Sequence, residues 1–136
     1  MFFAEKGAGA WMNESRLRVS ARSKMIESIF ATGIPYAGRS DLPATLQDIA
    51  RIAPGCAGIR RWGVASLDLT YVAAGRYDGF WERRLKSWDI AAGVIIVKEA
   101  GGLVGPINPR GDVIHDGEII ASNEAIFTGF SKLVRG

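Results

Sequence analysis

Two carboxylates in the second half of the chain stand where a metal or substrate site can form. Asp89 falls in the first turn of an expected helix, and Glu82 lies seven positions earlier at the end of an expected strand. The junction of a strand end and a helix start is where α/β proteins build sites, and paired carboxylates suit a hard divalent cation such as Mg²⁺. An acidic residue in a first turn is also favoured by the helix dipole alone, so a simple capping role for Asp89 stays open.

A glycine-containing turn provides a second candidate. Gly63, Val64 and Ala65 connect an expected strand to an expected helix, and backbone N–H groups at such a turn can approach a ligand closely. A glycine that merely permits close packing explains the turn equally well. The other glycine-rich stretch, residues 7–10, opens no helix and lacks the lysine of a phosphate loop, so it predicts a hairpin turn.

Basic residues follow Glu82 at Arg83, Arg84 and Lys86. Such a cluster attracts phosphorylated substrates, but it is also typical of a solvated loop. We expect Asp68 to lie on a helix surface. We also expect the tryptophans Trp62, Trp81 and Trp88 to belong to the core and to a pocket wall.

Cysteine and histidine usage excludes several classes of site. Cys56 and His115 are each the sole residue of their type, so an internal disulfide, a thiolate zinc cluster and a multi-histidine metal site are excluded. A Ser-His-Asp triad would depend on His115 alone, which falls in an expected polar loop. The lone cysteine and the absence of a recognisable export signal lead us to expect a cytoplasmic location.

Composition predicts one folded domain. The 136 residues are 48% hydrophobic and 23% charged, which is typical of a globular chain, and the longest apolar run, Ile90 to Val97, is too short to span a membrane. The net charge is only +3, and the excess lies within residues 1–24. Because that segment lacks a dense basic stripe with interleaved aromatics, nucleic-acid binding is possible but disfavoured.

Hydrophobic periodicity predicts strands alternating with helices, and hence a layered α/β core. The segment 88–100 is ambiguous, because Val94 to Val97 favours a strand while its length favours a helix. We interpret it as a helix that is apolar on most sides and sandwiched between layers. The expected strands are 2–5, 10–13, 17–19, 25–32, 59–62, 77–82, 103–107 and 119–121, and the expected helices are 42–53, 66–74, 88–100 and 123–134.

The fifteen residues from Trp88 to Gly102, WDIAAGVIIVKEAGG, resemble the C-terminal signature of the inositol monophosphatase family. The resemblance extends over essentially the whole chain. It includes the segments Gly9–Asn13, Leu17–Ser20, Gly58–Gly63, Leu69–Gly75 and Tyr77–Glu82, which are similar to the mid-chain hairpin and the preceding strand, helix and strand of bacterial members.

This resemblance implies a fold, the C-terminal half of a layered α/β sandwich with a mixed sheet flanked by helices. It also implies an activity, that of a Mg²⁺-dependent phosphomonoesterase acting on inositol monophosphate or a related sugar phosphate through metal-activated water. By position, Asp89 would be a catalytic metal ligand and Glu82 would bind substrate hydroxyls. The turn at Gly63, Val64 and Ala65 would line the substrate. Val64 departs from the small polar residue often found there, which removes one hydroxyl contact.

The family's N-terminal half carries an Asp-Pro-x-Asp-Gly-Thr motif and an upstream glutamate, and neither is present in residues 1–136. One carboxylate ligand does not hold Mg²⁺ against water. We therefore expect a C-terminal half, from a truncated reading frame, an expressed fragment or a split protein, that is inactive alone. The alternative is a non-catalytic module that binds RNA or a transcription complex. The resemblance also implies a homodimer. Relatives with similar signatures act on other phosphate esters.

Overall fold

A five-stranded mixed sheet forms the centre of the fold, with strand order β5-β4-β6-β8-β7. The computed structural model describes residues 1–35 and 41–136. β4 is parallel to both β5 and β6, whereas β8 is antiparallel to β6 and β7. The elements in chain order are β1 (Phe2–Glu5), β2 (Gly9–Met12), β3 (Ser15–Arg16), η1 (Met25–Glu27), β4 (Ile29–Thr32), α1 (Leu42–Ile52), η2 (Ala53–Gly55), β5 (Gly58–Arg60), α2 (Ala65–Ala73), β6 (Gly79–Glu82), α3 (Ser87–Glu99), β7 (Leu103–Gly105), α4 (Val113–Asp116), β8 (Ile119–Ser122) and α5 (Glu124–Arg135).

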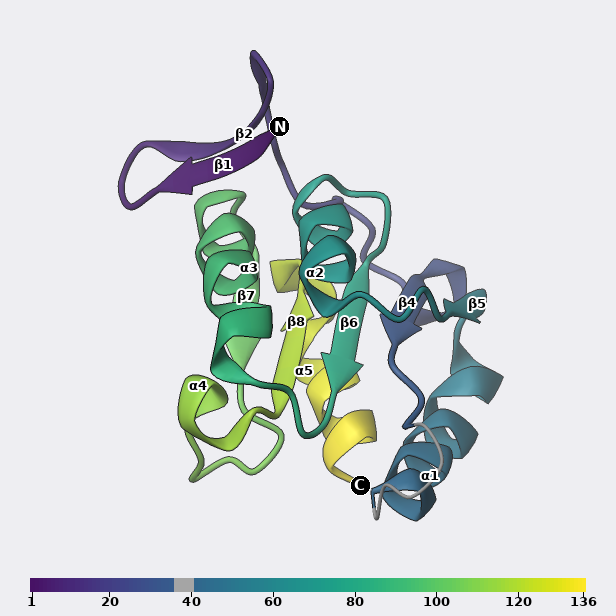
Figure 1. Ribbon diagram of the computed structural model, residues 1–136. Helices are drawn as coiled ribbons and strands as arrows, with labels where there is room; N and C mark the ends of the chain where they lie inside the picture. The colour runs from purple at the N-terminus through teal and green to yellow at the C-terminus, as the bar shows by residue number, and fades with distance from the viewer. Residues whose placement is uncertain (36–40) are drawn as a thin grey trace.

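Helices cover both faces of this sheet, which confirms the predicted layered α/β class. α2 and α3 lie side by side on one face, and α5 packs on the other with α1 against it (Figure 1). Each face encloses its own apolar cluster, one around Leu69 and Phe80 and the other around Phe30 and Trp81. Alternation along β6 sends Phe80 into one cluster and Trp81 into the other, because successive side chains of a strand point to opposite faces.

The segment predicted as a glycine turn is indeed a hairpin turn between β1 and β2. The turn's backbone N–H groups at Gly7 and Gly9 donate to the two carboxylate oxygens of Glu99, at 2.9 and 3.0 Å. These bonds hold the pKa of Glu99 below its usual value. The hairpin is thereby fixed against the C-terminal end of α3, from which it extends away from the sheet (Figure 1).

Several boundaries differ from the sequence-based expectation. The strand expected from Met25 begins only at Ile29, because Met25–Glu27 form a 3-10 turn in which the Ser28 N–H bonds to the Met25 carbonyl. His115 lies on the short helix α4 rather than in a loop. The last helix begins as predicted after Asn123, whose side chain accepts the Ile126 N–H at 3.0 Å. The loop expected before Pro43 includes residues 36–40, outside the described part of the chain.

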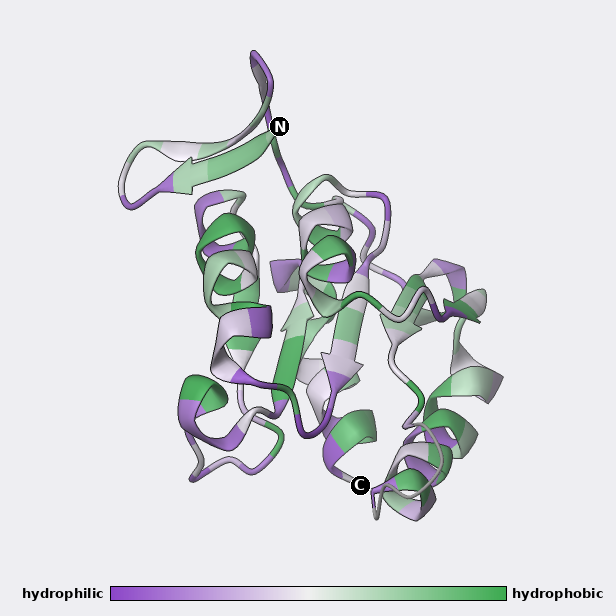
Figure 2. Cartoon of the chain, viewed as in Figure 1, coloured by the Kyte–Doolittle hydropathy of each residue, from purple (hydrophilic) through white to green (hydrophobic). Residues whose placement is uncertain are grey.

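The tryptophan expectation is only partly correct. Trp81 is fully buried, but Trp62 is 64% and Trp88 is 77% exposed. α3 is likewise not sandwiched along its whole length, although most of its turns are hydrophobic (Figure 2). Ile90, Gly93 and Val97 are buried, whereas Trp88 and Ile95 stay exposed. None of the helices in the described residues has the length and apolar character needed to cross a membrane.

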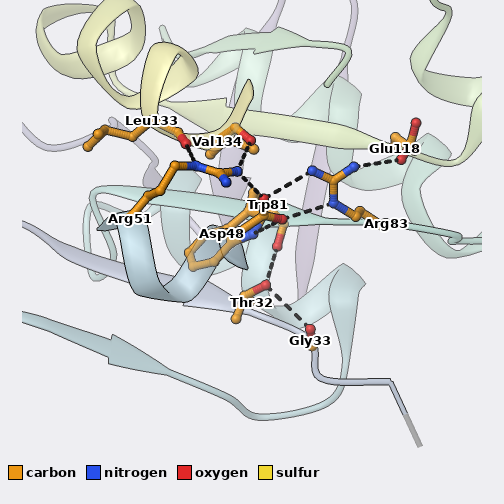
Figure 3. Close-up of polar contacts among 9 residues, drawn as sticks. All are labelled: Thr32, Gly33, Asp48, Arg51, Trp81, Arg83, Glu118, Leu133 and Val134. Carbon is orange, nitrogen blue, oxygen red and sulfur yellow. Dashed lines mark hydrogen bonds and ion pairs between the residues drawn. The ribbon is translucent and has the colours of Figure 1, made fainter. Parts of the chain in front are cut away.

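A buried carboxylate on α1, Asp48, connects three elements (Figure 3). It receives two hydrogen bonds from the Arg83 guanidinium, at 2.9 and 3.0 Å, and one from the Trp81 indole at 3.2 Å. Arg51 donates to Asp48 at 2.6 Å and also to the carbonyls of Leu133 and Val134 at the end of α5. The paired carboxylate raises the pKa of Arg83 above its ordinary value. Asp48 therefore links α1 to the end of β6, and Arg51 links α1 to the end of α5.

We predict that Asp48→Ala lowers the free energy of unfolding by about 3 kcal/mol or more, because it leaves the largely buried Arg83 guanidinium without its main partner. Urea denaturation measures this loss. Glu118→Gln removes the second, longer partner of Arg83, at 3.3 Å, and should cost less than about 1 kcal/mol. Equal losses in the two variants would contradict the central role of Asp48.

Asp68 is buried on α2 rather than exposed on the helix surface as expected, and neither of its carboxylate oxygens has a hydrogen-bond partner. Hydrophobic periodicity does not reveal this burial, because Asp68 precedes Leu69 on a helix whose apolar residues are not gathered on one face. Burial raises the pKa of Asp68 to about 7, from 3.8, and burial, followed by the Asp68 charge, raises the pKa of Tyr77. Folding therefore favours the protonated acid.

This burial predicts a stability that falls as the pH rises. Because the pKa of Asp68 is higher in the folded state than in the unfolded state, its contribution to the free energy of unfolding is complete below pH 4. It is then lost at up to about 1.4 kcal/mol per pH unit until the pH reaches the folded-state pKa. Asp68→Asn, which cannot ionise, should gain stability relative to the parent chain between pH 5 and pH 8 in denaturant titrations. If the two chains differ in free energy of unfolding by the same amount at pH 5 and at pH 8, this prediction is wrong.

Candidate functional site

A cavity of about 170 Å³ opens at the carboxyl ends of β4 and β6. These parallel strands pair Thr32 with Trp81, so the residues that follow each strand lie at one edge of the sheet. The N-terminal end of α1 and the turn before α2 complete its walls. Its lining residues are Gly33, Ile34, Pro35, Asp41, Thr45, Arg61, Gly63, Glu82 and Arg83.

The structure brings two of the candidate site residues, Glu82 and Gly63, into this cavity. Glu82 is the last residue of β6. Gly63 has a φ of +84°, a conformation that glycine adopts without strain, so glycine is required here by the turn itself. A strand end and a turn far apart in the sequence therefore meet at the sheet edge where a site was expected.

Val64 and Ala65 follow directly but do not line the cavity. Val64 is the N-cap of α2, with extended backbone and no side-chain capping bond, and Ala65 is the buried first residue of the helix. The first-turn N–H groups of α2 therefore receive no bond from the Val64 side chain. An anion at this helix end would be stabilised by those N–H groups and by the helix dipole.

Asp89 lies in the first turn of α3 and is also outside the cavity lining. Its Oδ2 accepts the Lys86 backbone N–H at 3.1 Å, which is the capping role that the sequence left open. α2 and α3 run parallel, with their N-terminal ends toward the carboxyl end of β6 (Figure 1). Asp89, Glu82 and the Gly63 turn therefore lie at the same end of the α2/α3 layer.

A magnesium ion needs several oxygen ligands, and Asp89 is the one that the sequence predicts. Among residues 1–35 and 41–136, no group of three His, Cys, Asp or Glu side chains is placed to hold a metal ion. The described residues therefore do not form a complete Mg²⁺ site. Further carboxylates would have to come from elsewhere.

The cations after Glu82 do not behave as one solvated loop. Arg83 lines the cavity, but its guanidinium is held by Asp48 and Glu118. Arg61, which sequence reasoning did not select, lines the same cavity and donates to the Ile34 carbonyl at 3.5 Å. Asp41, Thr45 and Gly33 were also missed, because a wall built from loop ends and an α1 terminus leaves no periodic signal.

Comparison with known proteins places these features in a family. The sequence model of the inositol monophosphatase family matches residues 1–135. An inositol-1-monophosphatase of Mesorhizobium japonicum is 42% identical over 135 residues, which cover 99% of this chain and 51% of the relative. A protein of Pseudomonas aeruginosa named Nus factor SuhB is 44% identical over 128 residues, covering 93% of this chain and 47% of its own length.

Solved structures agree with the sequence matches. The extragenic suppressor protein suhB of Bartonella henselae is 42% identical with a TM-score of 0.93, covering 98% of this chain and 52% of that one. An inositol monophosphatase of Anabaena gives a TM-score of 0.90 at 36% identity, with 98% and 54% covered. The chain thus spans about half the length of the curated relatives it matches. With its fold, its sequence and the predicted resemblance in agreement, the chain belongs to the inositol monophosphatase family.

Proposed function

We propose that this chain provides the substrate-binding side of a Mg²⁺-dependent phosphomonoesterase that hydrolyses inositol monophosphate or a related sugar phosphate. The observation that carries the proposal is the cavity at the carboxyl ends of β4 and β6, in which Glu82 meets Gly63 of the turn that leads into α2. Carboxylate acceptors next to helix N-terminal N–H groups match a ligand that has hydroxyls at one end and a phosphate at the other.

In this proposal each residue has a separate role. The Glu82 carboxylate accepts hydrogen bonds from substrate hydroxyls inside the cavity. The turn from Gly63 through Val64 to Ala65 presents backbone N–H groups to the substrate, and the apolar Val64 side chain adds no hydroxyl. Asp89 supplies one carboxylate ligand for the metal ion, from the first turn of α3.

The other half of the site would come from the part of the relatives that this chain does not match. About half of the Mesorhizobium relative lies outside the alignment. A single carboxylate at Asp89 binds Mg²⁺ too weakly to compete with water. We therefore propose that the chain is inactive alone and becomes active when the complementary half supplies the remaining ligands.

The test is phosphate release from inositol 1-phosphate in Mg²⁺. The purified chain is assayed alone and together with the separately expressed N-terminal half of the Mesorhizobium relative. We expect turnover only in the mixture, and we expect Asp89→Asn to reduce it about 100-fold, because the loss of an anionic ligand weakens metal-assisted catalysis.

Glu124→Gln is the matched control, since it also removes a first-turn acid, but from α5; it should leave the rate unchanged. Turnover by the chain alone that is lost in Asp89→Asn would contradict inactivity in isolation. A mixture without turnover would argue against the catalytic proposal.

A second candidate function is a non-catalytic interaction module. Four cations near the N-terminus, Arg16, Arg18, Arg22 and Lys24, are exposed, and one relative is named a Nus factor. RNA or a transcription complex would be the partner. Salt-dependent RNA binding that persists in Asp89→Asn would favour this reading. A cytoplasmic location remains a prediction from the sequence.

We also propose that the chain forms a homodimer, because α3 exposes apolar surface at Trp88 and Ile95. Ile95, which is 46% exposed, can be replaced without opening the core. Ile95→Lys should lower the weight-average mass in sedimentation equilibrium, because it places a charge on this face. Leu103→Lys, at a 41% exposed position on edge strand β7, is the control. An unchanged mass in Ile95→Lys would exclude this face as the interface.

A further inference from the structure

The side chain of Glu82 lies directly against the backbone of Gly33. A Cβ atom on Gly33 would overlap Oε1 and Cδ of Glu82 and would lie 3.1 Å from Cγ. Both residues line the same cavity. The Glu82 carboxylate therefore occupies the space that any side chain at position 33 would fill.

Backbone conformation does not explain the glycine at this position. Gly33 is absent from the glycines with positive φ, so an alanine could adopt its backbone angles. Its requirement is one of space alone. This distinguishes Gly33 from Gly63, where a φ of +84° disfavours every other residue.

The register of the sheet fixes this close approach. Thr32 pairs with Trp81 in the parallel ladder, and the Thr32 hydroxyl donates to the Trp81 carbonyl at 2.7 Å. Trp81 is in turn anchored through its indole to Asp48. Residues 33 and 82 follow this fixed pair, so their separation cannot relax without breaking buried hydrogen bonds.

We propose that Gly33 is a positioning residue. By having no side chain, it sets where the Glu82 carboxylate lies and thereby favours phosphate esters that carry hydroxyls next to the phosphate. The inference rests on the proposed function, in which Glu82 accepts hydrogen bonds from those hydroxyls. Gly33 itself contributes no chemical group to the substrate.

Gly33→Ala tests this directly. The added methyl group meets the far end of the Glu82 side chain rather than backbone, so the side chain and not the sheet has to move. Gly55→Ala is the matched control, because a Cβ at Gly55 would meet nothing within 4 Å. Both variants should keep the melting temperature of the parent chain within a few degrees.

The first measurement follows the Glu82 carboxyl carbon by ¹³C NMR in the isolated chain, with its resonance assigned through Glu82→Gln. We expect this resonance to shift in Gly33→Ala and to stay unchanged in Gly55→Ala. An unshifted resonance in Gly33→Ala would overturn the proposal without any activity measurement.

The second measurement uses the chain mixed with the complementary half. Gly33→Ala should raise KM for inositol 1-phosphate about tenfold, with a smaller change in kcat. The effect should be smaller for p-nitrophenyl phosphate, whose leaving group has no neighbouring hydroxyls. In a Glu82→Ala background, Gly33→Ala should add no further change, because its effect passes through Glu82.

Equal effects on both substrates, or full additivity with Glu82→Ala, would overturn the specificity role. If the parent mixture hydrolyses neither ester, the proposed function fails and the substrate preference fails with it. The carboxyl resonance still decides in that case whether Gly33 positions Glu82.

Discussion

The buried charge of Asp48 is the constraint that holds α1 against β6 and the residue that follows it. A carboxylate without solvent is stable only when its lone pairs are occupied, and here two guanidinium groups and an indole occupy them. Satisfying that one group links α1 to the Trp81 indole, and Arg51, one of its donors, also donates to carbonyls at the end of α5. It also aligns Arg83, the residue immediately after Glu82, along the cavity wall.

The geometry of the candidate site depends on this arrangement. Glu82 lies between two anchored neighbours in sequence, Trp81 and Arg83, and its carboxylate lies against the backbone of Gly33. Packing supports the same register, since Phe30 of β4 stacks on Phe130 at 4.2 Å and Trp81 meets Phe130 edge to face. A carboxylate held in this way is oriented before a ligand arrives, which reduces the entropic cost of binding.

Much of the architecture could be predicted from local pattern, whereas the details of burial could not. α1 and α5 have one apolar side, so their spacing indicates both helices and their buried faces. α2 and α3 are apolar on most sides, and such a pattern does not say which side a neighbour covers. The positions of Asp68 on α2 and of the exposed Trp88 on α3 were therefore predicted wrongly, whereas the exposed Trp62 lies in the segment between β5 and α2, where periodicity gives no information.

The candidate site shows the same division. Glu82 and Gly63 could be found because a strand end and a positive-φ turn leave signals in the sequence. Arg61, Asp41 and Thr45 could not, because their shared cavity arises from loop ends that only the tertiary fold brings together.

Foldability and completeness of the site are separate properties in this chain. The central sheet is covered on both faces by helices of the chain itself, and an apolar cluster is buried on each face. The hairpin fixed by Glu99 extends beyond this layered core, and the outer side of α3 leaves Trp88 and Ile95 exposed. In the proposed site, Glu82 lies at the end of the central strand β6, whereas Asp89, in the first turn of α3, would be one metal ligand among several. The position of Glu82 can therefore be altered at Gly33 without a change at Asp89, so that under the proposed function a change in substrate preference need not cost the chain its fold.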